Sequence, residues 1–382
     1  MAKVSILMPA CNVEKFIDEC MKSVISQTLE DIEIICVNDG SKDSTGEILD
    51  LYARKDPRVH IVHKPNSGYG HSMNVALDLA EGEYIGIVET DDYVSEDMFE
   101  QLYNMAKDND ADVVKANYYR YISKPEPQNT FFEVLKPYNH YDEVFSPKEY
   151  KNIMRVAPCI WSGIYRRKML IENNVRFNET PGASYQDTSF AFKVWTSAER
   201  VYLTKEAYLH YRVDNENSSV KSGAKVFCLC DEYREMEKYL EENPEKKECF
   251  EILKNALKYE SYRWNLERLS FGYKYAFLLE MRKEYLKAEE ANTLDKDYFS
   301  EQNWNNLQRI MHEMDRYYLE ECSKVCGIYK TPEDMAQALQ QKEAELDDLK
   351  HQFHDMENSK SFKAGRIITA IPRRVREIIS RK

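Results

Sequence analysis

The chain lacks the patterns of a disulfide framework, a zinc site or a membrane span. None of its nine cysteines forms a Cys-x-x-Cys pair, and the spacings of Cys228 to Cys230 and of Cys322 to Cys326 match neither kind of cross-link. No apolar run approaches the roughly 18 residues that a spanning helix needs. The first residues lead directly into a strand pattern without a signal peptide. We therefore expect reduced thiols and a cytoplasmic protein.

Net positive charge is also absent over most of the 382 residues, because Asp and Glu outnumber Lys and Arg by 66 to 53. The formal net charge is −13, which excludes general nucleic-acid binding because that function needs a basic face. The exception is the end of the sequence, since residues 360–382 hold eight Lys or Arg and one Glu. A basic tail on an acidic body is typical of a segment that contacts an anionic surface.

A dinucleotide-binding fingerprint is absent as well. The first expected strand ends in Pro9-Ala10-Cys11-Asn12, and the glycine-containing loop at 66–74 does not follow the G-x-G-x-x-G pattern. The sequence therefore argues against a hydride-transfer enzyme. His71 in that loop is better interpreted as a structural residue than as a catalytic one.

Strand and helix patterns alternate in the first third of the chain. Short apolar runs predict strands at residues 4–8, 32–37, 59–62, 84–88 and 113–116. Helix starts are indicated by Asn12, by the capping-box pattern at 44–47 and by the acidic residues at 95–97. This order predicts an α/β fold, with a mostly parallel open sheet and helices on both faces.

The remaining sequence predicts three further regions after a domain at residues 1–224. Within that domain, residues 118–145 are expected to form a loop region beside the site. Helices should start at 146–149 and after Asp187, and strands should lie near 160–165 and 208–212. Residues 225–330 are rich in Glu, Lys and Tyr and predict a separate helical module. Residues 331–358 carry about three heptads, typical of either an amphipathic helix on its own chain or a coiled coil between copies. Residues 359–382 predict a basic amphipathic tail, with a disordered tail as the alternative.

The acidic cluster Glu89-Thr90-Asp91-Asp92 follows the apolar run at 84–88. Ligands of open α/β sheets bind at the carboxyl ends of strands, and carboxylates there suit Mg²⁺ or Mn²⁺ that carries a phosphate-bearing substrate. The alternative interpretation is a turn whose acids cap a helix. Asp39 ends the second expected strand and Asp187 offers a further carboxylate far downstream, so we interpret the set as a metal-assisted transferase site for a nucleotide-linked donor.

Four segments in this order resemble glycosyltransferase family 2: Val-Ser-Ile-Leu-Met-Pro-Ala-Cys-Asn (4–12), Val-Asn-Asp-Gly-Ser-Lys-Asp (37–43), Asn-x-Gly (66–68) with Asn74, and Glu-Thr-Asp-Asp (89–92). The resemblance covers roughly residues 1–220 and continues through Trp-Ser-Gly-Ile-Tyr-Arg-Arg (161–167), Tyr-Gln-Asp-Thr-Ser-Phe (185–190) and His-Tyr-Arg (210–212). It implies a GT-A fold, an inverting mechanism and a preference for UDP-sugars. The tail at 359–374 likewise resembles a segment of bacterial members.

The resemblance also implies roles for single residues. Asp187 takes the place of the general base, and the metal ligands are Asp91 and His210. The expected contacts to the nucleotide-sugar are made by Pro9, Ala10, Asn12, Asp39, Asn66, Gly68, Asn74, Glu89, Asp92 and Arg212. For each of these the alternative is a packed structural residue.

Three positions depart from the family pattern. Cys11 stands where Tyr is usual, so the customary aromatic neighbour of the base is missing, and Glu89 is one methylene longer than the usual Asp. Gln186 replaces the Glu that usually precedes the base, which removes a like charge next to Asp187. Asp91 and Asp187 are both retained, so we expect activity.

The predicted function is that of a hexosyl- or N-acetylhexosaminyl-transferase in cell-surface polysaccharide biosynthesis. Its acceptor would be a hydroxyl of a glycan or a lipid-linked glycan, which fits a peripheral position on the inner face of the cell membrane and homo-oligomers through 331–358. A nucleotidyltransferase is a second possibility, although it leaves Asp187 unexplained. A third is a non-catalytic scaffold that binds nucleotide-sugar within a synthesis complex.

Overall fold

The computed structural model describes residues 2–215, 226–269 and 271–326, together with four separate helical positions at 341, 344, 348 and 351. The chain divides into two compact units, Met1–Met311 and His312–Lys382. The predicted coiled-coil segment, apart from those four positions, and the predicted basic tail lie outside the described residues.

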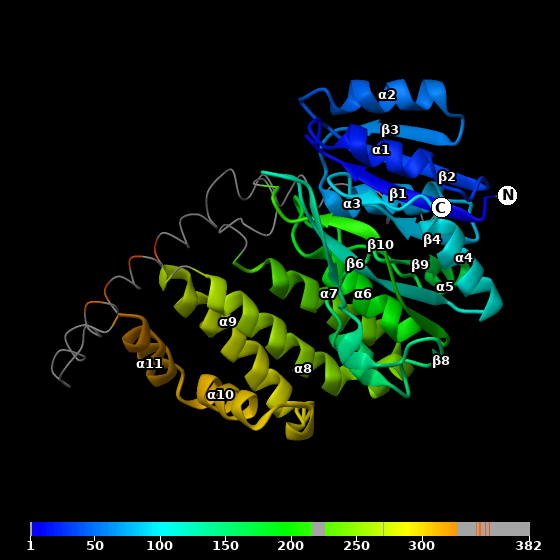
Figure 1. Cartoon of the computed structure of the whole chain (residues 1–382). Helices are drawn as coiled ribbons and strands as arrows, with labels where there is room; N and C mark the ends of the chain where they lie inside the picture. Colours follow the sequence, from blue (N-terminus) through cyan, green and yellow to red (C-terminus); the bar gives the residue numbers. More distant parts are fainter. Residues whose placement is uncertain are drawn as a thin grey trace, which may run out of the picture. The chain divides into compact units, whose positions relative to one another are not determined.

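A single ten-stranded sheet organises the first unit (Figure 1). Its main path runs β3-β2-β1-β4-β9-β6-β10-β5, with β7 paired to β6 and β8 paired to β10. The strands are β1 Val4–Ala10, β2 Ile32–Asp39, β3 Val59–Lys64, β4 Tyr84–Ile87, β5 Tyr93–Val94, β6 Val113–Ile122, β7 Gln128–Phe132, β8 Val144–Phe145, β9 Gly163–Arg166 and β10 Val201–Arg212.

The expected mostly parallel arrangement holds for one half of the sheet. Strands β3, β2, β1 and β4 are parallel neighbours, and β6 pairs with β10 in parallel. Strand β9 runs antiparallel between β4 and β6, and β5, β7 and β8 also pair antiparallel, so the sheet as a whole is mixed. Burial of β1 along its full length is what a central parallel strand requires.

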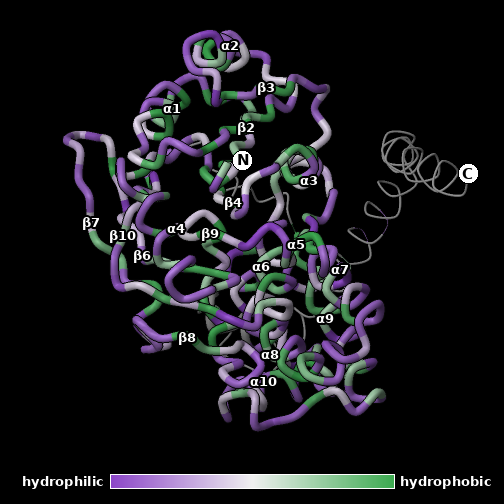
Figure 2. Tube along the Cα trace, turned by 90° about the vertical axis from the view of Figure 1, so that its right-hand side faces the viewer, coloured by the Kyte–Doolittle hydropathy of each residue, from purple (hydrophilic) through white to green (hydrophobic). Residues whose placement is uncertain are grey.

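Helices lie on both sides of the parallel half. The four helices of this part are α1 Ile17–Ile25, α2 Thr45–Lys55, α3 Tyr69–Leu79 and α4 Met98–Asp108. Figure 2 shows α1 and α3 on opposite sides of β2. In α1 the buried side chains are apolar and lie at the spacing of one helical face: Ile17, Cys20, Met21 and Val24.

Three helix starts differ from expectation. Asn12 does not cap a helix: its backbone is left-handed (φ 54°), its Oδ1 accepts from the Lys42 amide, and α1 begins only at Ile17. The capping box at 44–47 does not form, because the Ser44 side chain makes no capping bond and Asp43 accepts from the Thr45 amide instead. The Ser-Pro start at 146–147 leads to turns and the short helix η2 (Lys151–Arg155).

The region expected to be a loop at 118–145 is partly regular. β6 continues to Ile122 and forms an antiparallel hairpin with β7, which is followed by the short helix η1 (Lys136–Tyr138) and by β8. Most of β7 is exposed, so its sequence carries no apolar alternation that would indicate a strand. After β9 come α5 (Arg167–Glu172) and α6 (Gln186–Ser197), the helix expected after Asp187.

The region after residue 225 is helical, as predicted. Its elements are α7 Cys228–Glu242, α8 Pro244–Arg268, α9 Phe271–Glu290, η4 Lys296–Tyr298, α10 Glu301–His312 and α11 Met314–Cys326. Helices α7 to α9 belong to the same compact unit as the sheet and not to a separate module. The reason is packing of α7 on α6, where buried Lys193 of α6 pairs with Glu235 of α7 at 2.8 Å.

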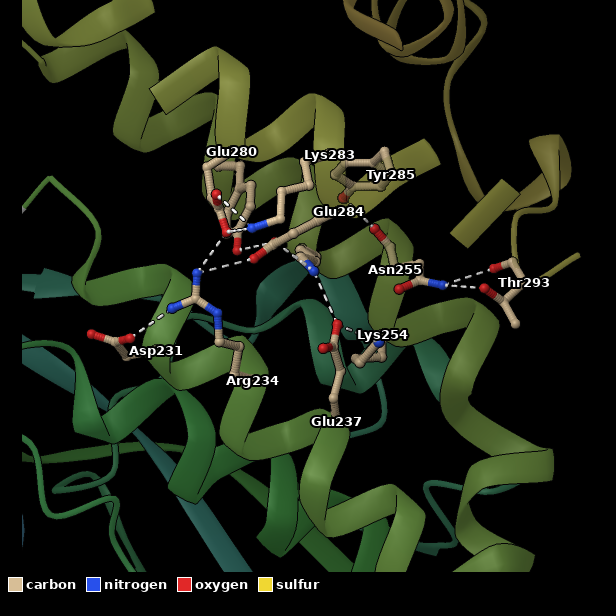
Figure 3. Close-up of polar contacts among 12 residues, drawn as sticks. Asp231, Arg234, Glu237, Lys254, Asn255, Glu280, Lys283, Glu284, Tyr285 and Thr293 are labelled. Carbon is tan, nitrogen blue, oxygen red and sulfur yellow. Dashed lines mark hydrogen bonds and ion pairs between the residues drawn. The ribbon is translucent and has the colours of Figure 1, made fainter. Parts of the chain in front are cut away.

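A buried network of charges joins α7, α8 and α9 (Figure 3). Lys258 of α8 contacts Glu237 of α7 at 2.9 Å and Glu284 of α9 at 2.7 Å, and Lys254 contacts the same Glu237 at 3.1 Å. Both lysines are 3% exposed. Because removing one partner of a buried pair leaves an uncompensated charge, the network fixes the relative positions of the three helices. No helix in the described part of the chain is long and apolar enough to cross a membrane.

Candidate active site

The acidic cluster lies where β4 leaves the sheet. Val88 continues the ladder by donating its amide to Leu7, and the Thr90 hydroxyl donates to the Pro9 carbonyl at 2.8 Å. This bond ties the turn to the carboxyl end of β1. Glu89 and Asp91 thereby lie at the sheet edge where open α/β folds bind ligands.

Asp92 serves the fold. Its carboxylate is 1% exposed, and Oδ1 accepts from the Arg212 amide at 2.8 Å. Oδ2 has no hydrogen-bond partner among the described residues. Burial, followed by the charge of Asp91, raises the pKa of Asp92 well above its ordinary value. The side chain thus fixes the end of β10 against the acidic turn.

Asp91 is only partly buried, and it is the member of the cluster best placed to meet a ligand. Its Oδ2 accepts from Asn215 Nδ2 at 2.8 Å, while Arg212 Nε donates to its carbonyl oxygen at 2.8 Å. The Arg212 guanidinium also pairs with Glu19 and lies over the Phe16 and Tyr121 rings. Arg212, 5% exposed, therefore holds the turn that presents Asp91.

Glu89 connects the acidic turn to the downstream carboxylate. Tyr69 donates its hydroxyl to Glu89 Oε1 at 2.6 Å. Burial raises the pKa of Glu89 to about 8; the Tyr69 bond opposes the rise, and the charges of Asp91 and Asp187 add to it. The Tyr69 amide also donates to the Gly182 carbonyl at 3.0 Å, which joins the loop before Asp187 to the acidic turn, although 98 positions separate Glu89 and Asp187 in sequence.

Asp187 lies in the first turn of α6, where the helix dipole stabilises a negative charge. Gln186 fixes the chain that leads into this helix: its Nε2 donates to Thr180 Oγ1 at 2.8 Å and to the Gly182 carbonyl at 3.1 Å. Its Oε1 accepts from the Ser184 amide at 2.5 Å. An ionised glutamate at this position could only accept hydrogen bonds, whereas the Gln186 amide also donates two, so the amide suits this loop better.

Glu232 of α7 is a site-supporting residue that the sequence interpretation missed. Its carboxylate is fully buried and accepts from Asn178 Nδ2 at 3.0 Å and from the Ser189 hydroxyl of α6. Burial raises the pKa of Glu232 to about 8, with the charge of Asp187 raising it further and that of Lys193 lowering it. Its only sequence signal is a helical spacing that places it on the apolar face of α7.

On the other side of the sheet edge, Asp39 organises the glycine-containing loop. Its two carboxylate oxygens accept from the amides of Ser67 (2.7 Å) and Gly68 (2.9 Å), and it pairs with Lys64. Asn66 Nδ2 donates to the Asp39 carbonyl at 2.9 Å. Gly68 has φ 92°, and a Cβ there would lie 2.8 Å from the Thr180 carbonyl, so the loop requires glycine.

The other positions expected around the nucleotide fall into two groups. Asn12 is exposed next to the buried Pro9 and Ala10 and accepts an amide of the 38–43 turn, so these three line the same edge as Asp39. Asn74 is 5% exposed and bonds both the carbonyl (2.9 Å) and the amide (2.9 Å) of Phe177. It therefore fixes the segment before α6.

His210 lies between two aromatic rings. Its imidazole stacks on Tyr93 at 4.2 Å and on Tyr119 at 4.8 Å, and its Nδ1–H donates to Asn129 Oδ1 at 2.7 Å. Burial lowers the pKa of His210 to about 4, so the ring is neutral with its lone pair on Nε2. Across residues 2–215, 226–269 and 271–326, no group of three His, Cys, Asp or Glu side chains is arranged to hold a metal.

Comparison with known proteins agrees with this geometry. The model of the family "Glycosyl transferase family 2" matches residues 5–172. Residues 5–172 thus resemble this family. The chain is 38% identical over 220 residues to the uncharacterized glycosyltransferase EpsJ of Bacillus subtilis, a match that spans 56% of this chain and 62% of EpsJ. The poly(ribitol-phosphate) beta-glucosyltransferase of Bacillus spizizenii is 30% identical over 224 residues, 57% of this chain and 34% of the relative.

Solved structures show the same fold. TarS of S. aureus matches with a TM-score of 0.55 and 21% identity, over 84% of this chain and 55% of TarS. Residues 1–349 of TarS in complex with UDP-GlcNAc match with a TM-score of 0.53 and 17% identity, over 86% of this chain and 93% of that one. The GT-A expectation and the helical C-terminal part are thereby confirmed. The chain spans less than two thirds of the length of EpsJ and about a third of the Bacillus spizizenii relative.

Proposed function

We propose that this protein is an inverting family 2 glycosyltransferase that moves a sugar from a UDP-sugar to a hydroxyl of a glycan or lipid-linked acceptor in cell-surface polysaccharide synthesis. The observation that carries the proposal is that Tyr69 links the acidic turn to the loop before α6: its hydroxyl donates to Glu89 Oε1 at 2.6 Å and its amide donates to the Gly182 carbonyl at 3.0 Å. This contact supports a role for Asp187, in the first turn of α6, together with Glu89 and Asp91. The names of the poly(ribitol-phosphate) beta-glucosyltransferase and of the TarS complex with UDP-GlcNAc support the acceptor class and the donor.

The base is Asp187. The acceptor hydroxyl passes its proton to the Asp187 carboxylate while its oxygen forms a bond to the anomeric carbon, and the bond from that carbon to the diphosphate breaks. Attack from the face opposite the leaving group inverts the anomeric configuration. Glu89, held by Tyr69, orients the donor sugar, and fixing the two reactants in line supplies much of the acceleration.

A divalent cation fits this chain through few protein ligands. Mg²⁺ and Mn²⁺ in transferases commonly take one or two protein side chains and complete their shell with phosphate oxygens and water. Asp91 offers a partly exposed carboxylate, and His210 a neutral imidazole whose Nδ1 is already bonded, which is the usual state of a metal-binding histidine. When bound, the cation would neutralise charge on the diphosphate.

The nucleotide is assigned to the edge formed by Pro9, Ala10, Asn12 and the loop that Asp39 orders. Five further residues are proposed to support donor binding indirectly, because they position the backbone around the site: Asn66, Gly68, Asn74, Asp92 and Arg212. A cytoplasmic, peripheral membrane location, reached through residues 359–382, and oligomers through 331–358 remain part of the proposal.

The test is turnover of a panel of UDP-, GDP- and dTDP-sugars with Mn²⁺ or Mg²⁺, followed as release of the nucleoside diphosphate. Asp91→Asn and Asp187→Asn should each lower transfer at least a hundredfold, the range that general-base and electrostatic contributions cover. Asp108→Asn at the exposed end of α4 is the matched control and should change nothing. NMR of the product should show inverted anomeric configuration. Donor binding without any turnover would favour the non-catalytic scaffold, and absence of nucleotide binding would refute both.

A further inference from the structure

A cluster of Trp264, Tyr185 and Arg268 includes a half-exposed indole, lies next to the proposed base in sequence and takes no part in the site described so far. Trp264 of α8 is 45% exposed, whereas Trp161 and Trp195 are 9% and 4% exposed. The Tyr185 ring meets the Trp264 ring edge-on at 5.9 Å and 87°. The Arg268 guanidinium lies over the Trp264 ring at 4.8 Å and over the Tyr185 ring at 5.6 Å. These contacts hold a half-exposed indole in one orientation.

The cluster is adjacent to Asp187 because Tyr185 immediately precedes α6. Tyr185 has φ 67°, a left-handed conformation that is strained for a bulky side chain. Such strain persists only where the surrounding structure imposes it, and it gathers at functional sites. Here it turns the Tyr185 ring onto Trp264 two residues before the carboxylate that is proposed to receive the proton of the acceptor.

The helix that carries Trp264 is anchored at two places. Glu260, Trp264 and Arg268 follow at intervals of four residues and share one helical face. Glu260 pairs with Arg155 of η2, so this face is held against the sheet-bearing part of the unit. The buried lysine network visible in Figure 3 fixes α8 from the side of α7 and α9. The indole therefore belongs to a rigid element, as a binding platform requires.

We propose that Trp264, Tyr185 and Arg268 form the subsite for the acceptor, and that the group they take is a pyranose ring. This subsite rests on the function proposed above. One face of a pyranose is a patch of C–H groups, which a half-exposed indole held by Tyr185 and Arg268 can cover. The donor nucleotide is assigned to the strand ends of β1 and β2, so a sugar on Trp264 approaches Asp187 from the acceptor side.

The experiment measures donor and acceptor parameters separately in the full chain. Octyl glycosides of glucose, galactose, N-acetylglucosamine and N-acetylgalactosamine serve as acceptors, with the donor that the nucleotide-sugar panel identifies. Trp264→Ala should raise the acceptor KM about tenfold, the size of one good aromatic contact. Donor KM and the slow hydrolysis of the donor without acceptor should stay within twofold. Trp264→Phe should recover part of the loss.

The matched control is Tyr273→Ala, which removes an aromatic ring of 47% exposure from α9. It should leave both KM values unchanged. An unchanged acceptor KM in Trp264→Ala, with normal donor hydrolysis, would overturn the subsite while the proposed function stands. A protein that neither binds nor hydrolyses any donor would refute the function, and the subsite would fall with it.

Discussion

Asp39 should contribute to stability even in the absence of any nucleotide. Asp39→Asn leaves Lys64 without its counter-charge, and the two side chains are 7% and 10% exposed. Breaking such a pair costs roughly 3–5 kcal/mol. The side-chain NH₂ of the new asparagine also faces the backbone N–H of either Ser67 or Gly68, so one hydrogen bond is lost. This loss adds about 1 kcal/mol to the destabilisation. With the lower end of that range for the broken pair, the two effects together give an expected loss of about 4 kcal/mol.

Thermal unfolding followed by circular dichroism measures this loss. At about 2.1 cal/mol/K per residue, the unit Met1–Met311 has an unfolding entropy near 0.65 kcal/mol/K, so the Tm should fall by roughly 6 °C. The double variant Asp39→Asn/Lys64→Met should recover part of it, because no buried charge then remains uncompensated. The control Asp50→Asn breaks the exposed contact to His63 and should shift the Tm by about 1 °C or less.

A different outcome would refute the structural role. If the Tm of Asp39→Asn equals that of the wild-type protein but the variant no longer binds UDP, then Asp39 acts on the nucleotide and does not order the loop. If the double variant is less stable than the sum of the two single changes, the pair with Lys64 is not the source of the loss.

Three further changes test the positioning of the base. Folding raises the pKa of the Glu232 carboxyl from 4.5 to about 8, so this group stabilises the wild-type protein fully below pH 4.5. The stabilisation is lost as pH rises to 8, at up to about 1.4 kcal/mol per pH unit. Glu232→Gln removes the titrating group, so the free energy of unfolding of the variant should decline less steeply with pH. Gln186→Glu should lower the Tm more at pH 8 than at pH 5, since only the protonated acid can donate to Thr180. Gly70→Ala should cost about 1–3 kcal/mol in urea unfolding, because its Cβ would lie 2.0 Å from the Asn178 carbonyl oxygen.

The sequence predicts the parallel half of the fold well because its buried strands are apolar runs between turn residues. β7 cannot be predicted in this way, because its side chains are mostly exposed and its position depends on pairing with β6. Local capping rules misplace Asn12, because tertiary bonds to the 38–43 turn take over its side chain. A local capping preference determines the structure only where no stronger tertiary contact uses the same side chain.

The candidate site divides in the same way. Glu89 and Asp91 can be predicted from their position after β4, because strand ends at a sheet edge form the ligand site. That Tyr69 joins the loop before Asp187 to the acidic turn depends on the path of the chain through β9 and the 178–184 loop, which no local pattern encodes. The role of Glu232 is the most difficult to predict. A glutamate on an acidic helix is normally interpreted as solvent-exposed, and only the helical spacing shows that Glu232 lies on the apolar face of α7.

The dependence of α6 on α7 leads to a last prediction about the expected boundary at residue 224. α6 buries Lys193 at 2% exposure, and its partners Glu235 and Tyr239 lie on α7. A chain that ends at residue 224 removes both partners and also the Glu232 carboxylate, which would leave a buried cation and an apolar face open to water. We expect amides of α6 to exchange hydrogen within seconds in that fragment, while amides of β1 stay protected in both proteins. Equal protection of α6 in the fragment and the full chain would mean that the sheet domain positions its base without the helices that follow it.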